Sequence, residues 1–291
     1  MRKVLSLRYG VAFRKAFGDP EVFSAFTSDM LGVSIKVDKV EPEKTFLRLA
    51  DLVKVEYDLF AEDTTHRIIV EVQHIREEDY LDRFLYYHLF GMLEQVRSHE
   101  DYRFARDVYT LVVLTRKPRK VDLRFSVATL AMDLVNERKA PLGAFRHKLV
   151  LVNPRDINDA TPPSARRWME LIADSLDEEV DETQYPDPLF QRIVGTLERD
   201  DLDGAELAAL KDEAGWENAK RQEREDGREE GREQGLQQGL LEALVALCEV
   251  LGVELTTPRR EVLARADAAA LQALLAHLKR ARRWPEGDLL P

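Results

Sequence analysis

Apolar and charged residues alternate along two short stretches between Val53 and His74, which are joined by a polar turn. Successive side chains of a strand point to opposite faces, so this alternation predicts a hairpin of two strands. If Thr64 and Thr65 form a two-residue turn, residues whose numbers sum to 129 lie opposite each other. Asp58 then faces Glu71 across the hairpin, with Cβ atoms roughly 5 Å apart.

Further apolar patterns predict the elements around this hairpin. Helices are expected at 11–17 and 20–31, with Asp19 and Pro20 starting the second. A third helix begins near Glu77, and its apolar stripe is Tyr80, Phe84, Tyr87, Leu89, Met92 and Leu93. Almost continuous apolar runs at 108–114 and 147–152 are typical of strands covered on both faces. This order predicts an α/β fold in which helices flank a mixed sheet.

After residue 160 the pattern predicts helices alone. Glycine recurs every four residues from Gly227 to Gly239, which follows one ridge of a helix. Such a bare ridge suits either a homodimer seam or a solvated helical linker, and the sequence leaves both open. The expected division is a core at 1–160, an acidic helical region at 161–223, the glycine repeat at 224–240 and a small helical module at 241–291.

The formal net charge of −11 is unevenly distributed. Residues 1–150 hold 25 Lys and Arg against 23 Asp and Glu, or +2, whereas residues 151–291 hold 18 against 31, or −13. The first half also carries a cationic cluster at Arg116, Lys117, Arg119, Lys120 and Arg124. Clustered cations can contact nucleic-acid phosphates whatever the global charge, although a basic loop after a strand is the alternative.

The single cysteine, Cys248, excludes an intramolecular disulfide and zinc clusters built on paired cysteines. No signal-peptide pattern is present at the N-terminus, and no stretch approaches the ~20 apolar residues of a membrane span. We therefore expect a cytoplasmic protein without a membrane partner.

The facing acids Asp58 and Glu71 need a physical reason, because like charges directly opposite in a sheet are unfavourable. One reason is a divalent cation, since Mg²⁺ is commonly bound by one or two carboxylates, other oxygens and water. The alternative is a solvated hairpin face on which two acids meet by accident, because a third of the residues are charged.

Five sequence pieces occur in an order that resembles a known family. They are Ala12–Asp19, Tyr57–Asp58, Ile69–Gln73, Arg83–Tyr87 and Glu100–Tyr102. An acid in one strand followed by Glu-x-Gln in the next is similar to the PD-(D/E)XK nuclease motif. The set of five resembles the Rpn family of recombination-promoting nucleases and putative transposases, over roughly residues 8 to 160.

The resemblance implies a restriction-endonuclease-like core and a metal-dependent endonuclease. Asp58 and Glu71 would bind Mg²⁺ or Mn²⁺ together with the Val72 carbonyl, and Gln73 would orient a water molecule. Arg83 and the cationic cluster with Lys117, Arg119 and Lys120 would hold the DNA backbone. Arg83 has an alternative as a partner of Asp79, four residues earlier in its helix.

The sequence departs from the family pattern at two positions. Gln73 stands where the general motif has lysine, and Gly10 stands where family members often carry an acid. The first departure removes a cation that could orient water, and an amide cannot serve as a general base. Two functions are therefore weighed: a Mg²⁺-dependent DNA endonuclease associated with recombination or transposition, and a non-catalytic scaffold that retains the nuclease fold.

Overall fold

The computed structural model describes the chain except residues 47–54, 74–79, 97–102, 117–123, 199–201 and 286–291. It divides into two compact units, Met1–Ala214 and Gly215–Pro291, which we describe separately. The expected four-part division of the sequence is not tested by this two-part division and stays a prediction.

Two helices follow a short N-terminal strand in the first unit. β1 covers Arg2–Lys3, α1 covers Gly10–Phe17 and α2 covers Pro20–Leu31. The Asp19 side chain accepts hydrogen bonds from the main-chain N–H groups of Glu21 and Val22, so it caps α2 as predicted. Gly32, with φ of 67°, ends this helix in the left-handed region.

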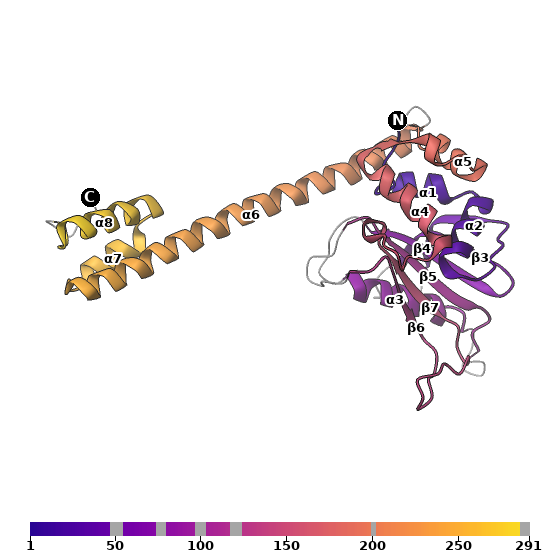
Figure 1. The fold of residues 1–291 in the computed structure, drawn as a ribbon, viewed down its shortest axis with the longest axis horizontal. Coiled ribbons are helices and arrows are strands. Elements are labelled where there is room, and N and C mark those ends of the chain that lie inside the picture. Colours follow the sequence, from indigo (N-terminus) through magenta and orange to yellow (C-terminus); the bar gives the residue numbers. More distant parts are fainter. Residues whose placement is uncertain (47–54, 74–79, 97–102, 117–123, 199–201, 286–291) are drawn as a thin grey trace. The chain divides into compact units, whose positions relative to one another are not determined.

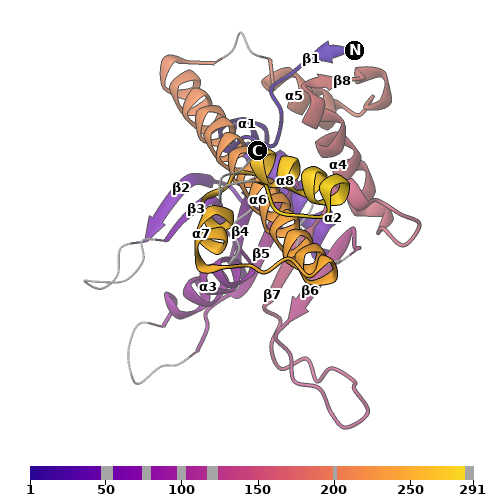
Figure 2. The same cartoon turned by 90° about the vertical axis from the view of Figure 1, so that its left-hand side faces the viewer.

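A mixed sheet forms the centre of the first unit. In the part of the chain that the structure describes, its strands are β2 (Val40–Phe46), β3 (Val55–Glu62), β4 (His66–Gln73), β5 (Asp107–Leu114), β6 (Val127–Ala131) and β7 (Lys148–Val152). Their order is β2-β3-β4-β5-β7-β6, which Figure 2 shows from one edge to the other. β5 runs parallel to β4 and β7, and the other neighbours are antiparallel. The predicted mixed sheet is confirmed, whereas β6 was not anticipated.

Helices cover both faces of this sheet (Figure 1). One face packs against α1 and α2 through a cluster that includes Phe13, Phe26 and Leu111. The opposite face packs against α3 (Tyr80–Leu93), where Phe84 is fully buried against Val112.

The predicted apolar stripe of α3 is wrong at two positions. Leu89 is 39% exposed and Leu93 is 63% exposed, whereas His88 is fully buried. The buried face follows positions 84, 88 and 92, because residues four apart lie on one side of a helix. His88 enters this face by bonding to the Thr110 hydroxyl, 2.9 Å from its Nδ1.

The segment after the last strand packs into the same core. It contains η1 (Pro154–Asp156), α4 (Pro163–Asp174), η2 (Ser175–Asp177), β8 (Glu179–Val180), η3 (Glu182–Gln184) and α5 (Pro188–Thr196). β8 pairs with β1 in a separate two-stranded sheet. The buried Trp168 contacts the rings of Phe17, Phe26 and Phe190, so α4 and α5 belong to the hydrophobic core around α1 and α2.

The C-terminal part is helical, as predicted. α6 (Gly204–Leu251) is continuous through the glycine repeat, and α7 (Thr257–Arg265) and α8 (Ala268–Ala281) follow. Within the second unit, Leu244 and Cys248 pack against Leu271 and Leu274 of α8. A Cβ atom at any of Gly227, Gly231, Gly235 or Gly239 would meet no described atom within 4 Å, so this ridge is open within the chain. Neither of its two interpretations is thereby decided.

Among the described residues, no helix combines the length and apolar character that a membrane span needs.

A candidate carboxylate site between two strands

The hairpin of β3 and β4 has the predicted turn and register. Asp63 Oδ1 accepts from the main-chain N–H groups of Thr65 at 2.7 Å and His66 at 2.6 Å, which fixes the turn. From the turn outward, paired residues run from Glu62 opposite Arg67 to Leu59 opposite Val70. This register places Asp58 and Glu71 at the next position, as the alternation of the sequence predicted.

The regular β3–β4 pairing ends at Leu59 and Val70, one position before the two acids. β3 stays paired with β2 as far as Val55, and β4 stays paired with β5 as far as Gln73. Beyond this point, bonds from main-chain N–H groups to side chains replace the main-chain bonds between β3 and β4. Asp58 N–H donates to Glu71 Oε1 at 3.2 Å, and Val72 N–H donates to Asp58 Oδ2 at 2.9 Å. The two carboxylates are therefore brought together, each bonded to the main chain of the opposite strand.

Both carboxyl groups lie in surroundings that disfavour their charge. Glu71 is only 4% exposed, and the Asp58 side chain is 25% exposed. Burial and the neighbouring Asp58 raise the pKa of Glu71 well above its ordinary value. Burial also raises the pKa of Asp58, although the Val72 N–H and the Arg14 guanidinium act in the opposite direction. A nearby positive charge would therefore stabilise the ionised forms of both carboxyl groups.

Arg14 of α1 supplies such a charge, and its role was missed in the sequence. Its Nη1 lies 3.5 Å from Asp58 Oδ1, and its Nη2 lies 2.9 Å from Glu43 Oε1. The segment Ala12–Asp19 carried part of the family resemblance, yet 44 residues separate Arg14 from Asp58. Only the packing of α1 against the sheet brings them together.

Gln73 continues the site along β4 and is bound by Arg83 of α3. Gln73 is 8% exposed, and its Oε1 accepts from Arg83 Nη2. The Arg83 guanidinium also lies over the rings of Phe84 and Tyr87, with its carbon 4.9 and 5.8 Å from their centroids. Arg83 is thus part of the site through Gln73. Its alternative partner Asp79 lies outside the described residues.

The remaining DNA-binding candidates Lys117, Arg119 and Lys120 also lie outside the described residues. Their expected contact with the DNA backbone stays a prediction.

The donor set suits a small, hard cation held by few protein groups. Asp58 and Glu71 offer carboxylate oxygens and Val72 offers a main-chain carbonyl, which are the ligand types that Mg²⁺ and Mn²⁺ accept. Over the described residues, no cluster of three or more His, Cys, Asp or Glu side chains is arranged for a metal. Two carboxylates are still compatible with Mg²⁺, because Mg²⁺ commonly keeps several waters and binds substrate phosphates.

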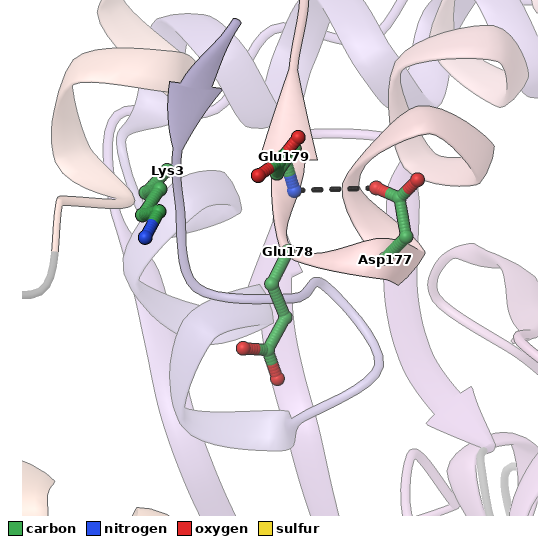
Figure 3. A pocket seen from close by; sticks show the side chains of 4 residues that line it. All are labelled: Lys3, Asp177, Glu178 and Glu179. Carbon is green, nitrogen blue, oxygen red and sulfur yellow. Dashed lines mark hydrogen bonds between the residues drawn. The ribbon is translucent and has the colours of Figure 1, made fainter.

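A cavity of about 280 Å³ lies elsewhere in the first unit, beside the pairing of β1 with β8 (Figure 3). Lys3, Asp177, Glu178 and Glu179 line it. Asp177 Oδ1 accepts from the Glu179 N–H at 3.2 Å, so part of this acidic lining serves the local turn. The cavity contains none of the residues of the carboxylate site.

Comparison of the sequence with models of known protein families and with curated proteins finds no match.

Proposed function

We propose that this protein is a metal-dependent DNA endonuclease with a restriction-endonuclease-like core, related to the Rpn recombination-promoting nucleases. The observation that carries the proposal is the pair Asp58 and Glu71 on neighbouring strands, each with its carboxylate bonded to a main-chain N–H of the opposite strand. A buried pair of like charges destabilises the folded state, and such pairs are found most often at catalytic or binding sites. The proposal is also supported by the sequence, because Asp58 and Glu71 are the acids of the segment that resembles the PD-(D/E)XK motif.

Asp58 and Glu71 would hold Mg²⁺ or Mn²⁺, with the Val72 carbonyl as a further ligand. A bound divalent cation neutralises charge on a scissile phosphate and lowers the pKa of water. The two carboxylates would hold the cation in their ionised forms, and their raised pKa values predict that cation binding improves as pH increases.

Gln73 positions water in this proposal. Its Oε1 accepts from Arg83, and the amide group of a glutamine can also donate a hydrogen bond to water. Arg83 therefore orients Gln73 and places a positive charge beside the site. Hydrolysis of phosphodiester bonds would supply the breaks that recombination or transposition needs.

The alternative is a nuclease-fold scaffold that binds partners without cutting DNA. The observation in its favour is that Gln73 replaces the lysine of the general motif and is itself held by Arg83. In this case Asp58 and Glu71 are a weak cation site or a remnant.

Plasmid nicking separates the two functions. Purified protein is incubated with supercoiled DNA and Mg²⁺, Mn²⁺ or EDTA, alongside Glu71→Gln. Glu56→Gln is the matched control, because Glu56 is an exposed acid on the same strand as Asp58. We expect cation-dependent nicking that Glu71→Gln reduces by at least about 100-fold, since even outer-shell partners of metal sites are worth 10–100-fold.

Three results would count against the proposal. Nicking that survives Glu71→Gln, or nicking that Glu56→Gln reduces equally, would separate the activity from the carboxylate pair. No nicking with either cation would favour the scaffold.

A further inference from the structure

The two edge strands of the six-stranded sheet differ in charge. In the described part of the chain these edges are β2 and β6 (Figure 2). Charged residues and proline commonly protect an edge strand from pairing with another chain. In β2 such residues are Glu41, Pro42, Glu43 and Lys44. By contrast, residues 125–132, which contain β6, include no charged residue and no proline, although a third of the chain is charged.

The main chain of β6 presents hydrogen-bonding groups on its outer side. Asn153 N–H donates to Ser126 O at 2.8 Å, and Met132 N–H donates to His147 O at 3.1 Å. Even-numbered residues therefore bond toward β7, because bonded and non-bonded positions alternate along an antiparallel pair. On the other side of β6 the described residues form no further strand. The residues whose N–H and C=O groups point to that side are Val127, Thr129 and Ala131.

β6 is complementary to a second copy of itself. In an antiparallel pair with a two-fold axis at Thr129, Thr129 faces its own counterpart and Val127 faces Ala131 of the second copy. All the outward-pointing groups of the strand are then paired. Leu130, which is 46% exposed, faces the small Ala128 of the second copy, so a large side chain meets a small one. No like charges meet across the axis, because this stretch has none.

The arm, residues 132–147, joins β6 to β7 and adds an apolar surface beside this edge (Figure 1). Asp133 fixes its shape, since the carboxylate accepts from Gly143 N–H at 2.7 Å and from Ala144 N–H at 2.8 Å. The arm nevertheless holds four large apolar side chains that are 45–63% exposed. They are Leu134, Val135, Leu142 and Phe145.

We propose that β6 is the edge through which two copies of this protein form a dimer. The two β6 strands pair antiparallel about a two-fold axis at Thr129 and join the two sheets into one. Five residues of each strand cover only part of the roughly 800 Å² per partner that a stable interface buries, so the apolar side chains of the arm contribute the rest. A two-fold contact of this kind uses the same surface of both copies, so association stops at the dimer.

The proposed interface is separate from the carboxylate site. β5 and β7 lie between β6 and β4, the strand that carries Glu71. The inference therefore does not depend on the proposed function, and its test needs neither metal nor DNA.

The test is the mass of the full-length protein in solution, measured by light scattering during size-exclusion chromatography and by sedimentation equilibrium at micromolar concentrations. The wild type should be a dimer. Thr129→Lys and Thr129→Glu should each be monomeric, because like charges then face each other at the axis. Mixing these two variants in equal amounts should restore the dimer, since a lysine then faces a glutamate.

Three further variants separate loss of the interface from loss of structure. Thr129→Val keeps a strand-forming side chain and should remain a dimer. Thr129→Pro removes an N–H that points away from β7, so it should give a folded monomer. Thr45→Lys places a lysine on the opposite edge strand, β2, and should leave the dimer intact. Circular dichroism and thermal unfolding confirm that each variant is folded.

A wild type that is monomeric at every concentration would overturn the inference. A dimer that persists in both Thr129→Lys and Thr129→Glu would also overturn it, because the contact would then lie elsewhere, for example along the glycine repeat. The same conclusion follows if the mixture of these two variants stays monomeric, or if Thr45→Lys dissociates the dimer equally.

Discussion

The two ends of the β3–β4 hairpin hold acids in opposite ways. At the turn end, Arg67 Nε lies 2.6 Å from Glu62, and Arg67 Nη1 lies 2.7 Å from Glu94. Asp63 beside them is partly buried, which raises its pKa, but the hydrogen bonds from His66 and Thr65 outweigh this and lower it overall. At the open end, Asp58 and Glu71 face each other, and both pKa values are raised.

This difference separates acids whose charge is neutralised by neighbouring groups from acids whose charge is only partly neutralised. The turn-end carboxylates have cations or N–H donors that offset the cost of leaving water. The open-end pair has Arg14 and two main-chain N–H groups, which do not offset burial. A cation beside such an incompletely neutralised pair would stabilise the ionised forms of both carboxyl groups.

The largest effect on stability is expected from removing the cation of the turn end. Arg67 is 7% exposed and also donates to the Gly91 carbonyl at 2.9 Å. Arg67→Ala therefore removes the nearest cation from the partly buried Glu62 and Glu94, and it leaves Glu62 with the more distant Arg106 at 3.8 Å. We expect the free energy of unfolding to fall by about 3–5 kcal/mol, measured in urea. Lys39→Ala, at a surface side chain that is 78% exposed, should change it by less than about 0.5 kcal/mol. A loss below about 1 kcal/mol in Arg67→Ala would contradict the structural role of this end.

A somewhat smaller effect on the free energy of unfolding, an increase, is expected when Mg²⁺ or Mn²⁺ binds at the open end. At a concentration about 100 times Kd, the cation should stabilise the protein by about 2.7 kcal/mol, seen as a higher Tm. The increase should be larger at pH 8.5 than at pH 6, because both carboxylates must lose their protons and both pKa values are raised. Asp58→Asn should abolish the increase and Asp63→Asn should keep it. An equal increase in both variants would place the cation elsewhere.

A third prediction concerns the charge at the open end without metal. Glu71→Gln keeps an oxygen for the Asp58 N–H and removes a buried like charge, so in EDTA at pH 8 it should stabilise the protein by about 1–2 kcal/mol. The raised pKa of Glu71 sets the sign: the folded state holds the proton more tightly, so wild-type stability falls as pH rises through that pKa. Urea unfolding should therefore show no gain below about pH 4, near the ordinary pKa of Glu. Destabilisation at pH 8 would show that Asp58 and Glu71 are not a strained pair.

The smallest effect is expected from Asp63→Asn at the turn. The amide oxygen can still accept from Thr65 and His66, so the cost should be about 0.5–1 kcal/mol. The pH dependence should have the opposite sign, because the pKa of Asp63 is lowered: its stabilisation is present above the ordinary Asp pKa and lost as pH falls through the lowered value. Urea unfolding across pH 2–7 measures this. A cost that grows at low pH would contradict the assignment.

Sequence reasoning was most successful where the determinants are local. The alternation around Thr64 and Thr65 gave the hairpin, its turn and its register, because one slip of a residue would exchange its two faces. Asp19 and Pro20 marked the start of α2, because a capping residue and a first-turn proline act within a single turn. The stripe of α3 was less secure, since Leu89 and His88 are neighbours and only the packing against β5 decided which one is buried.

The sequence by itself therefore determined the hairpin that carries Asp58 and Glu71, and it placed Gln73 beside them. Only the tertiary structure decided that the regular pairing of β3 with β4 ends before these acids, while β3 stays paired with β2 and β4 with β5. It also brought Arg14 to Asp58 and Glu213 to Gly10. Hydrophobic periodicity reports which face of an element is buried, but it does not report which distant charge meets that face. Such encounters depend on how helices pack on the sheet, and the ionisation of the carboxylate pair follows from them.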